Sequence, residues 1–229
     1  YGKDLRDTPS WQDVREMQVH LGEVKIVERV TGFKKIRYGT HENLGAEEAD
    51  LPELTMEAFA VWLQPSLEAL RRGQDVLDSP TPAAGGMGAT EDPGSWSDST
   101  LVLPPWVTDG LQGLGELLRQ MGSMRLMCDP HDLVGVLGPG QQDWSSPGAG
   151  DAALLPALYL HESHPGGVGL AETLYTLIDQ VALDGLHALL SCPCQDGCPS
   201  CVGPPDREDQ IKKQAARFLL ETLAGEHVH

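Results

Sequence analysis

The sequence predicts an α+β fold: antiparallel strands on the N-terminal side, then helices and short strands, closed by a four-cysteine zinc knuckle. Three observations lead to this class. Residues 22–38 alternate apolar and polar side chains with the period of a strand. Residues 170–190 repeat leucine, isoleucine and valine with the period of a helix. Four of the five cysteines then follow within residues 192–201.

Length and composition bound the class of protein. The chain has 229 residues, 40% of them hydrophobic, which suffices for a buried core in a globular domain. We find no apolar run of membrane-spanning length and no secretion signal, so we expect no membrane partner. The chain opens at Tyr1 rather than at methionine, which we interpret as a piece of a longer protein or a processed product. Clustered cysteines without a signal peptide predict a reducing, cytoplasmic compartment.

Composition also divides the chain into three parts. Residues 1–72 form a β-rich N-terminal part. Residues 73–105 are dominated by Gly, Pro, Ser, Thr and Asp, and we expect a flexible segment because so little apolar surface cannot offset the entropy of ordering. Residues 106–229 form an α/β zinc-binding part.

In the N-terminal part, the run at residues 22–38 bends at Thr31 and Gly32 and predicts an antiparallel pair with one solvated face. Residues 56–63 predict a further strand, with a helix as the open alternative, and residues 66–72 the end of an element.

The C-terminal part contains longer apolar periodicities. In chain order we expect a helix over 108–121, a short strand over 124–127, a loop over 138–150, a buried strand over 154–160, a glycine turn, a helix over 170–190 and a last helix from Asp206.

The cysteines at 192, 194, 198 and 201 follow the pattern C-x-C-x₃-C-x₂-C. Four thiolates this close suit a tetrahedral Zn²⁺, and the full coordination sphere leaves no position for a catalytic water. Two disulfides within ten residues would be strained, and disulfides, iron or a redox pair are the alternatives. We therefore predict that Cys192, Cys194, Cys198 and Cys201 bind a structural zinc ion. The remaining cysteine, Cys128, fits a small buried hydrophobe.

Other polar clusters have a simpler structural interpretation. The turn at Gly166, Gly167 and Gly169 suits positive φ angles, although its N–H groups could hold an anion. Two further polar groups have structural explanations that we favour over metal binding or acid–base chemistry. Helix capping suits the first group, Asp129, His131 and Asp132. Loop polarity suits the second, His161, Glu162 and His164. No Walker motif, nucleophile elbow or H-E-x-x-H occurs, so we predict no catalytic residue in this chain.

The net charge of −18 argues against a strong, autonomous nucleic-acid binder, because affinity for phosphate depends on Lys and Arg. The charge is uneven, however, with a basic run at residues 23–37 followed by an acidic one at 42–53. A solvated surface explains the basic run. The alternative is a ribbon in which Lys34, Lys35 and Arg37 contact a nucleic-acid backbone.

The sequence resembles the C-terminal zinc-binding module of the MrfA (mitomycin repair factor A) family of superfamily 2 DNA helicases. The resemblance covers residues 22–202, interrupted by the Gly/Pro/Ser-rich segment. Its stretches are residues 24–43, Leu51-Pro52-Glu53 with Met56, residues 128–132 and residues 157–202. The last stretch is the specific one, because it joins a Gly-Gly turn, a long helix and the four-cysteine pattern.

The resemblance implies motor domains with an ATP site upstream in the parent polypeptide, and no enzymatic activity in this chain alone. It implies zinc at the four cysteines and a parent that translocates on DNA in repair, although the same module occurs in phage-defence systems. We therefore expect an accessory domain that braces the motor core and helps to guide nucleic acid. The alternative is an acidic protein-interaction module of a repair or phage-defence complex.

Overall fold

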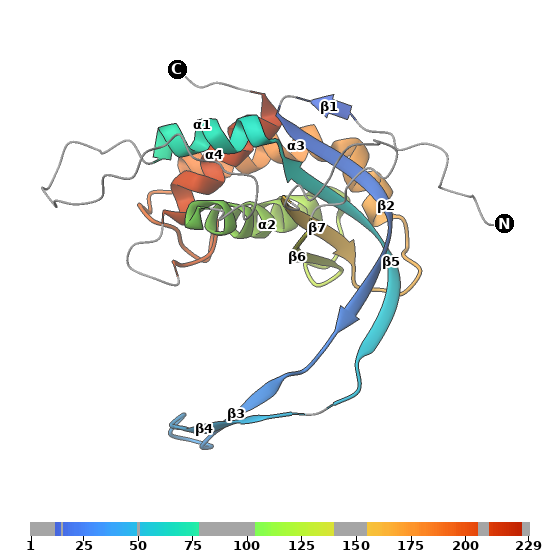
Figure 1. Cartoon of the computed structure of the whole chain (residues 1–229), viewed down its shortest axis with the longest axis vertical. Coiled ribbons are helices and arrows are strands. Elements are labelled where there is room, and N and C mark those ends of the chain that lie inside the picture. The colour runs from blue at the N-terminus through green and yellow to red at the C-terminus, as the bar shows by residue number, and fades with distance from the viewer. Residues whose placement is uncertain are drawn as a thin grey trace, which may run out of the picture.

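The computed structural model describes residues 12–14, 16–49, 51–77, 104–139, 155–205 and 211–225 (Figure 1). Its strands are β1 (Gln12–Val14), β2 (Met17–Glu28), β3 (Gly32–Ile36), β4 (Asn43–Glu48), β5 (Leu54–Pro65), β6 (Leu133–Pro139) and β7 (Pro156–Glu162). Its helices are α1 (Leu67–Leu77), α2 (Pro105–Leu126), α3 (Leu170–Ser191) and α4 (Lys212–Ala224). The predicted α+β class is confirmed, including the antiparallel N-terminal sheet and the cysteine cluster near the C-terminus.

Five strands form one antiparallel sheet in the order β1-β2-β5-β7-β6. The long central pair runs in register from Met17 opposite Pro65 to Glu28 opposite Leu54. Because side chains alternate between the two faces of a strand, Val19 and Leu63 point together into the core. Helices α2 and α3 cover this face of the sheet (Figure 1).

Helix α2 lies at the centre of the core and contacts both α3 and α4. Two of its glycines, Gly110 and Gly113, let α4 approach closely, which explains their presence in a helix interior. A Cβ atom on Gly110 would lie 3.0 Å from the Cβ of Ala215, and one on Gly113 would lie 3.0 Å from the Cβ of Ala216. Among the described helices, none combines the length and hydropathy that a membrane span requires.

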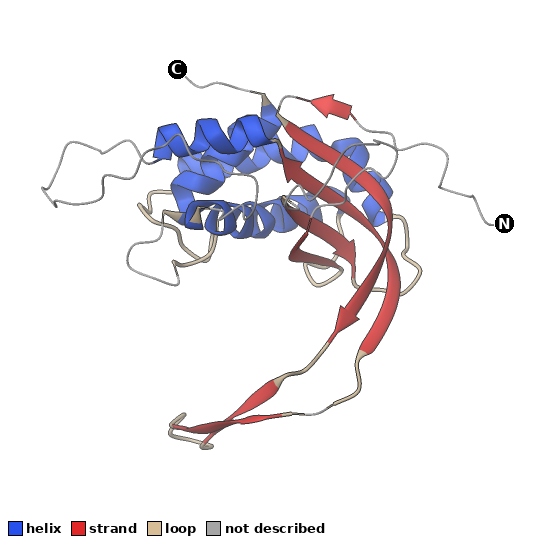
Figure 2. Ribbon diagram, in the orientation of Figure 1, coloured by secondary structure: helices blue, strands red, loops and turns tan. Residues whose placement is uncertain are grey.

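The C-terminal end of β2 and the N-terminal end of β5 extend beyond the helices and lead into the β3–β4 hairpin (Figure 2). We call residues 23–49 and 51–57 the arm. The arm contributes no side chain to the described hydrophobic core. Instead it exposes large apolar side chains, namely Val27, Val30, Phe33, Ile36, Tyr38, Leu44, Leu51 and Leu54.

Strand pairing within the arm differs from the sequence prediction. Residues 22–38 do contain two strands, but β2 and β3 do not pair with each other. Each pairs instead with a later strand, β2 with β5 and β3 with β4. Of the two options for residues 56–63, the strand is confirmed.

Three local predictions were wrong. Residues 66–72 begin a helix rather than end an element, since the backbone N–H of Ala69 donates to Ser66 Oγ at 3.1 Å. Residues 124–127 finish α2, where Arg125 pairs with Asp184 of α3. Strand β6 was not anticipated and overlaps the start of the predicted loop at 138–150. Most of the predicted flexible segment, residues 78–103, and the predicted helix start at residue 206 lie outside the described residues.

Candidate metal centre

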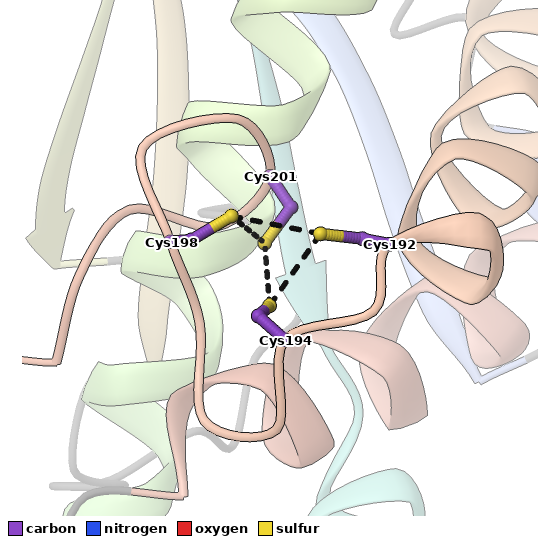
Figure 3. Close-up of side chains that lie close together, drawn as sticks. All are labelled: Cys192, Cys194, Cys198 and Cys201. Atoms are coloured by element: carbon purple, nitrogen blue, oxygen red, sulfur yellow. Dashed lines mark hydrogen bonds between the residues drawn. The ribbon is translucent and has the colours of Figure 1, made fainter.

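The four clustered cysteines lie between the end of α3 and the start of α4 (Figure 3). Their Sγ atoms all lie within 4.8 Å of one another. The Sγ–Sγ separation is 3.5 Å for Cys192–Cys194, Cys192–Cys198 and Cys194–Cys201, and 3.6 Å for Cys198–Cys201. No other His, Cys, Asp and Glu cluster in the described ranges has such metal-ligand spacing.

These separations match a tetrahedral metal site. With Zn–S bonds of about 2.3 Å, tetrahedral geometry places the sulfurs about 3.8 Å apart, close to the observed values. A disulfide needs an S–S bond of about 2.05 Å, and all four thiols are free in this structure. Four sulfur ligands suit zinc or iron, so the donor set alone leaves both metals open.

The backbone closes the cysteine loop through a tight turn after the third cysteine. The carbonyl of Cys198 accepts hydrogen bonds from the backbone N–H groups of Cys201 and Gly203, both at 3.0 Å. Gly197 adopts a φ of +130°, and a Cβ atom there would lie only 2.6 Å from the carbonyl oxygen of Gly203. This close approach brings the two halves of the pattern together.

Burial differs among the four thiols. Cys201 is fully buried in the core, whereas the other three are partly exposed. Burial raises the pKa of the Cys201 thiol to about 12. Hydrogen bonds, first from the backbone N–H of Cys194 and then from the thiols of Cys194 and Cys198, lower the pKa of Cys192 to about 7. A bound cation would keep all four thiols deprotonated, so metal binding releases protons.

Sequence reasoning missed a lysine beside this cluster. The Nζ of Lys213, in the first turn of α4, donates hydrogen bonds to the backbone carbonyls of Cys192, at 2.8 Å, and Cys194. A lysine in the first turn of a helix opposes the helix dipole, and this is a sequence signal that could have revealed it. The signal was hidden because the helix was expected to begin earlier, at Asp206. Cys128 packs, partly buried, against the core, away from the four-thiol cluster.

Backbone N–H groups of the glycine turn and of the start of α3 bind a carboxylate of this same chain. The buried carboxylate of Glu162 accepts hydrogen bonds from the backbone N–H groups of Val168 and Ala171, the latter at 3.0 Å. The three turn glycines Gly166, Gly167 and Gly169 all have positive φ, as the turn interpretation requires. Binding of an external anion there stays a prediction.

The second polar cluster forms a capped turn before β6. Asp129 Oδ1 accepts a hydrogen bond from the backbone N–H of His131, at 2.8 Å, and lies 2.7 Å from its ring Nδ1. The pKa of Asp129 is lowered mainly by the hydrogen bond from the backbone N–H of His131, and then by the hydrogen bond with the His131 ring. Asp132 accepts from the N–H of Asp129 and lies 3.9 Å from the ring of His164. The ring of His161 is buried and contacts the carbonyl of Glu162. These contacts account for Asp129, His131 and Asp132 as turn-forming groups, whereas His161 and Glu162 are buried at the end of β7 and do not belong to a polar loop.

The basic run of the arm faces the acidic run across the β3–β4 hairpin. Lys35 pairs with Glu47, and Arg37 pairs with Glu42 at 2.9 Å. Lys34 is exposed and forms no ion pair within the described part of the chain. Exposed pairs of this kind contribute about 0–1 kcal/mol, so they remain open to exchange for another anion. A nucleic-acid contact at these three cations stays a prediction.

Comparisons with known proteins identify the zinc-binding part. Residues 114–202 match the family model "MrfA Zn-binding domain", and this segment includes all four clustered cysteines. The match selects zinc over iron for the sulfur cluster. Residues 114–202 of this chain are therefore similar to an MrfA zinc-binding domain and contain four clustered cysteines.

Two relatives and one solved structure are also similar to this chain. The chain is 29% identical over 201 residues to the uncharacterized ATP-dependent helicase YprA of Bacillus subtilis, covering 88% of this chain and 22% of YprA. It is 38% identical over 71 residues to the uncharacterized protein MJ1572.1 of Methanocaldococcus jannaschii, covering 29% of this chain and 63% of that protein. A crystal structure of the DUF1998 helicase MrfA bound to DNA shares the fold, with a TM-score of 0.61 and 24% identity over 93% of this chain and 23% of MrfA.

The chain thus spans less than a quarter of the two helicases that it matches.

Proposed function

We propose that Cys192, Cys194, Cys198 and Cys201 hold one structural zinc ion in an accessory domain of an ATP-dependent DNA helicase of the repair type. The observation that carries this proposal is the set of four free thiols at tetrahedral separations within the segment that matches the zinc-binding family. All four positions are sulfur, so the zinc serves the fold rather than catalysis. A reducing cytoplasm fits this role, because only reduced thiols bind the metal.

The comparisons support a helicase parent. Both matched helicases are more than four times as long as the region shared with this chain, and the described residues contain no nucleotide-binding motif. In the proposal, the motor domains belong to the same polypeptide and carry the ATPase. The present domain braces those motor domains and helps to guide the nucleic acid, so it meets DNA through the parent.

The arm is the part of the domain best suited to these contacts. It extends beyond the helices, exposes apolar side chains and contains both signs of charge (Figure 1). An exposed apolar set of this kind marks an interaction surface. Because Lys34, Lys35 and Arg37 lie on the same hairpin, the arm could contact motor domain and phosphate together.

A protein-interaction module of a repair or phage-defence complex is the second candidate. The net charge of −18 and the exposed apolar residues of the arm favour it over autonomous DNA binding. The two candidates differ in their response to salt, since phosphate contacts weaken steeply as salt rises.

Charge reversal in the full-length parent separates the candidates. The double variant K34E/K35E should weaken single-stranded DNA binding uniformly across sequences. It should also flatten the salt dependence by about one unit of slope for each phosphate that the variant no longer neutralises. Its zinc content should match that of the unaltered protein, because both lysines are exposed. Unchanged DNA affinity at low salt in the folded variant would support the protein-interaction module instead.

The gene provides a second test. Helicase motifs should occur in frame upstream of the codon for Tyr1, and an upstream region without them would remove the helicase parent from the proposal.

A further inference from the structure

Two lysines open helix α4, where a helix ordinarily favours acidic side chains. The first turn contains Lys212 and Lys213 and no Asp or Glu. Their charges oppose the positive end of the helix dipole, at a cost of about 0.3–1 kcal/mol each. Violations of such local rules cluster at functional sites, so the groups that each ammonium contacts are informative.

The two lysines contact the cysteine knuckle, which spans residues 192–203, or the residue that directly follows it. Lys212 is 6% exposed, and its Nζ lies 3.5 Å from the carbonyl oxygen of Pro204, just after the knuckle. Lys213 is partly buried and donates to the carbonyls of Cys192 and Cys194, the first two cysteines. The contact with two consecutive cysteine carbonyls fixes the C-x-C segment relative to α4.

The electrostatics of this position favour a cation for two reasons. Cys192 ends α3, whose last turn contains no Lys or Arg of its own, so Lys213 supplies the positive charge that the negative end of α3 lacks. Four thiolates around Zn²⁺ carry a net charge of about −2, and the ammonium group lies on the backbone of two of them.

We propose that Lys213 is a positioning residue of the zinc centre, which orients Cys192 and Cys194 toward the metal and offsets the negative charge of the occupied site. This inference rests on the proposed zinc ligands. Groups in the outer sphere of a metal site ordinarily change metal affinity by about 10- to 100-fold when they are removed. Lys213 differs from an ordinary surface lysine because both of its hydrogen bonds end on ligand residues.

The test measures zinc affinity in the 229-residue chain by competition with a chromogenic chelator. K213M removes the charge and both hydrogen bonds, and it should bind zinc about 10- to 100-fold more weakly. K213R keeps the charge and can donate to both carbonyls, so it should retain most of the affinity. The matched control is R217M, which removes a positive charge one turn later on α4, where Arg217 pairs only with Glu221 in the described structure.

Cobalt substitution adds a readout of geometry. Visible absorption of Co²⁺ in a four-thiolate site reports how the ligands are arranged, and it should change in K213M but match the unaltered chain in K213R and R217M. Thermal unfolding at the same excess of zinc should show K213M less stable by about 1.4–2.8 kcal/mol, which is its 10- to 100-fold loss of zinc affinity expressed as free energy, whereas R217M should show no such zinc-linked loss.

Several results would overturn the role of Lys213. These are equal zinc affinity in K213M and the unaltered chain, equal reductions of affinity in K213M and R217M, and failure of K213M to fold even at saturating zinc. The last would assign Lys213 to the fold rather than to the metal. Absence of zinc binding in the unaltered chain would instead contradict the proposed function, so the two failures are distinguishable.

Discussion

Replacing Gly197 by alanine tests whether the backbone of the knuckle, and not the thiols alone, determines zinc affinity. The substitution leaves all four cysteines in place. It adds a Cβ atom 2.6 Å from the carbonyl oxygen of Gly203 and 3.0 Å from Cγ2 of Val202, at a φ of +130°. The carbonyl group of Gly203 cannot move away easily, because the backbone N–H of the same residue donates a hydrogen bond to the carbonyl of Cys198.

The expected loss of zinc affinity in G197A follows from two free-energy costs. Placing alanine at such a φ costs about 1–2 kcal/mol. Overpacking against backbone and a buried side chain costs about 1–3 kcal/mol more. The metal-free loop can relax, so most of this cost falls on the zinc-bound form. A combined cost of about 2–5 kcal/mol lowers zinc affinity by about 30- to 4,000-fold.

Gly45 supplies the matched control, since its φ of +127° is nearly the same and a Cβ atom there meets nothing within 4 Å. G45A therefore carries the backbone strain without the collision and without proximity to the cysteines. Competition with a chelator should show a large loss of zinc affinity in G197A and none in G45A. Equal affinities in G197A and the unaltered chain would refute the argument that the tight turn positions the ligands.

Other consequences of the structure can be measured on the same chain. Elemental analysis should find about one zinc per molecule, C201S should lose it together with substantial thermal stability, and C128S should keep it; zinc retained in C201S would contradict the ligand assignment. E162A leaves two backbone N–H groups at the start of α3 without a partner, and denaturant titration should show a loss of about 1–3 kcal/mol, while an unchanged midpoint would refute the capping role. The isolated chain should not hydrolyse ATP with or without DNA, because it contains no phosphate-binding lysine motif; DNA-stimulated hydrolysis in a helicase-free preparation would overturn this expectation.

The periodicity of apolar residues was sufficient to predict the type and bounds of an element that has one buried face. Strand β7 and helix α3 were predicted within two residues of their ends, since an apolar repeat of sufficient length defines each. The four-thiol cluster could be predicted equally well, because all four cysteines lie within ten residues and can be recognised without knowledge of the tertiary structure.

Predictions failed where the deciding contact lies far away in sequence. Met124–Met127 has apolar residues that favour a strand, yet α2 continues because Arg125 reaches Asp184 on α3. The partners of β2 and β3 were wrong for the same reason, since their register depends on β5 and β4. The ion pairs of the basic run, Lys35 with Glu47 and Arg37 with Glu42, likewise depend on the pairing of β3 with β4 and could not be assigned from the sequence.

The position of the knuckle makes a final prediction about local stability. The knuckle links the end of α3 to the segment that leads into α4, and both helices pack on α2. Its own apolar anchors are Cys201 and Val202, both fully buried, whereas its other cysteines depend on the thiol cluster and Lys213. The core of the sheet, by contrast, is buried without any metal contact.

Removing zinc with a strong chelator should therefore loosen the molecule unevenly. In hydrogen exchange, amides of the last turn of α3, the knuckle and the first turn of α4 should lose the most protection. Amides of β5 in the segment 60–63, which pairs with β7, should remain among the slowest to exchange. Loss of protection by the same factor in both regions would mean that zinc holds the whole fold as one cooperative unit. Full protection of the knuckle without zinc would mean that the thiol cluster needs no metal to keep its shape.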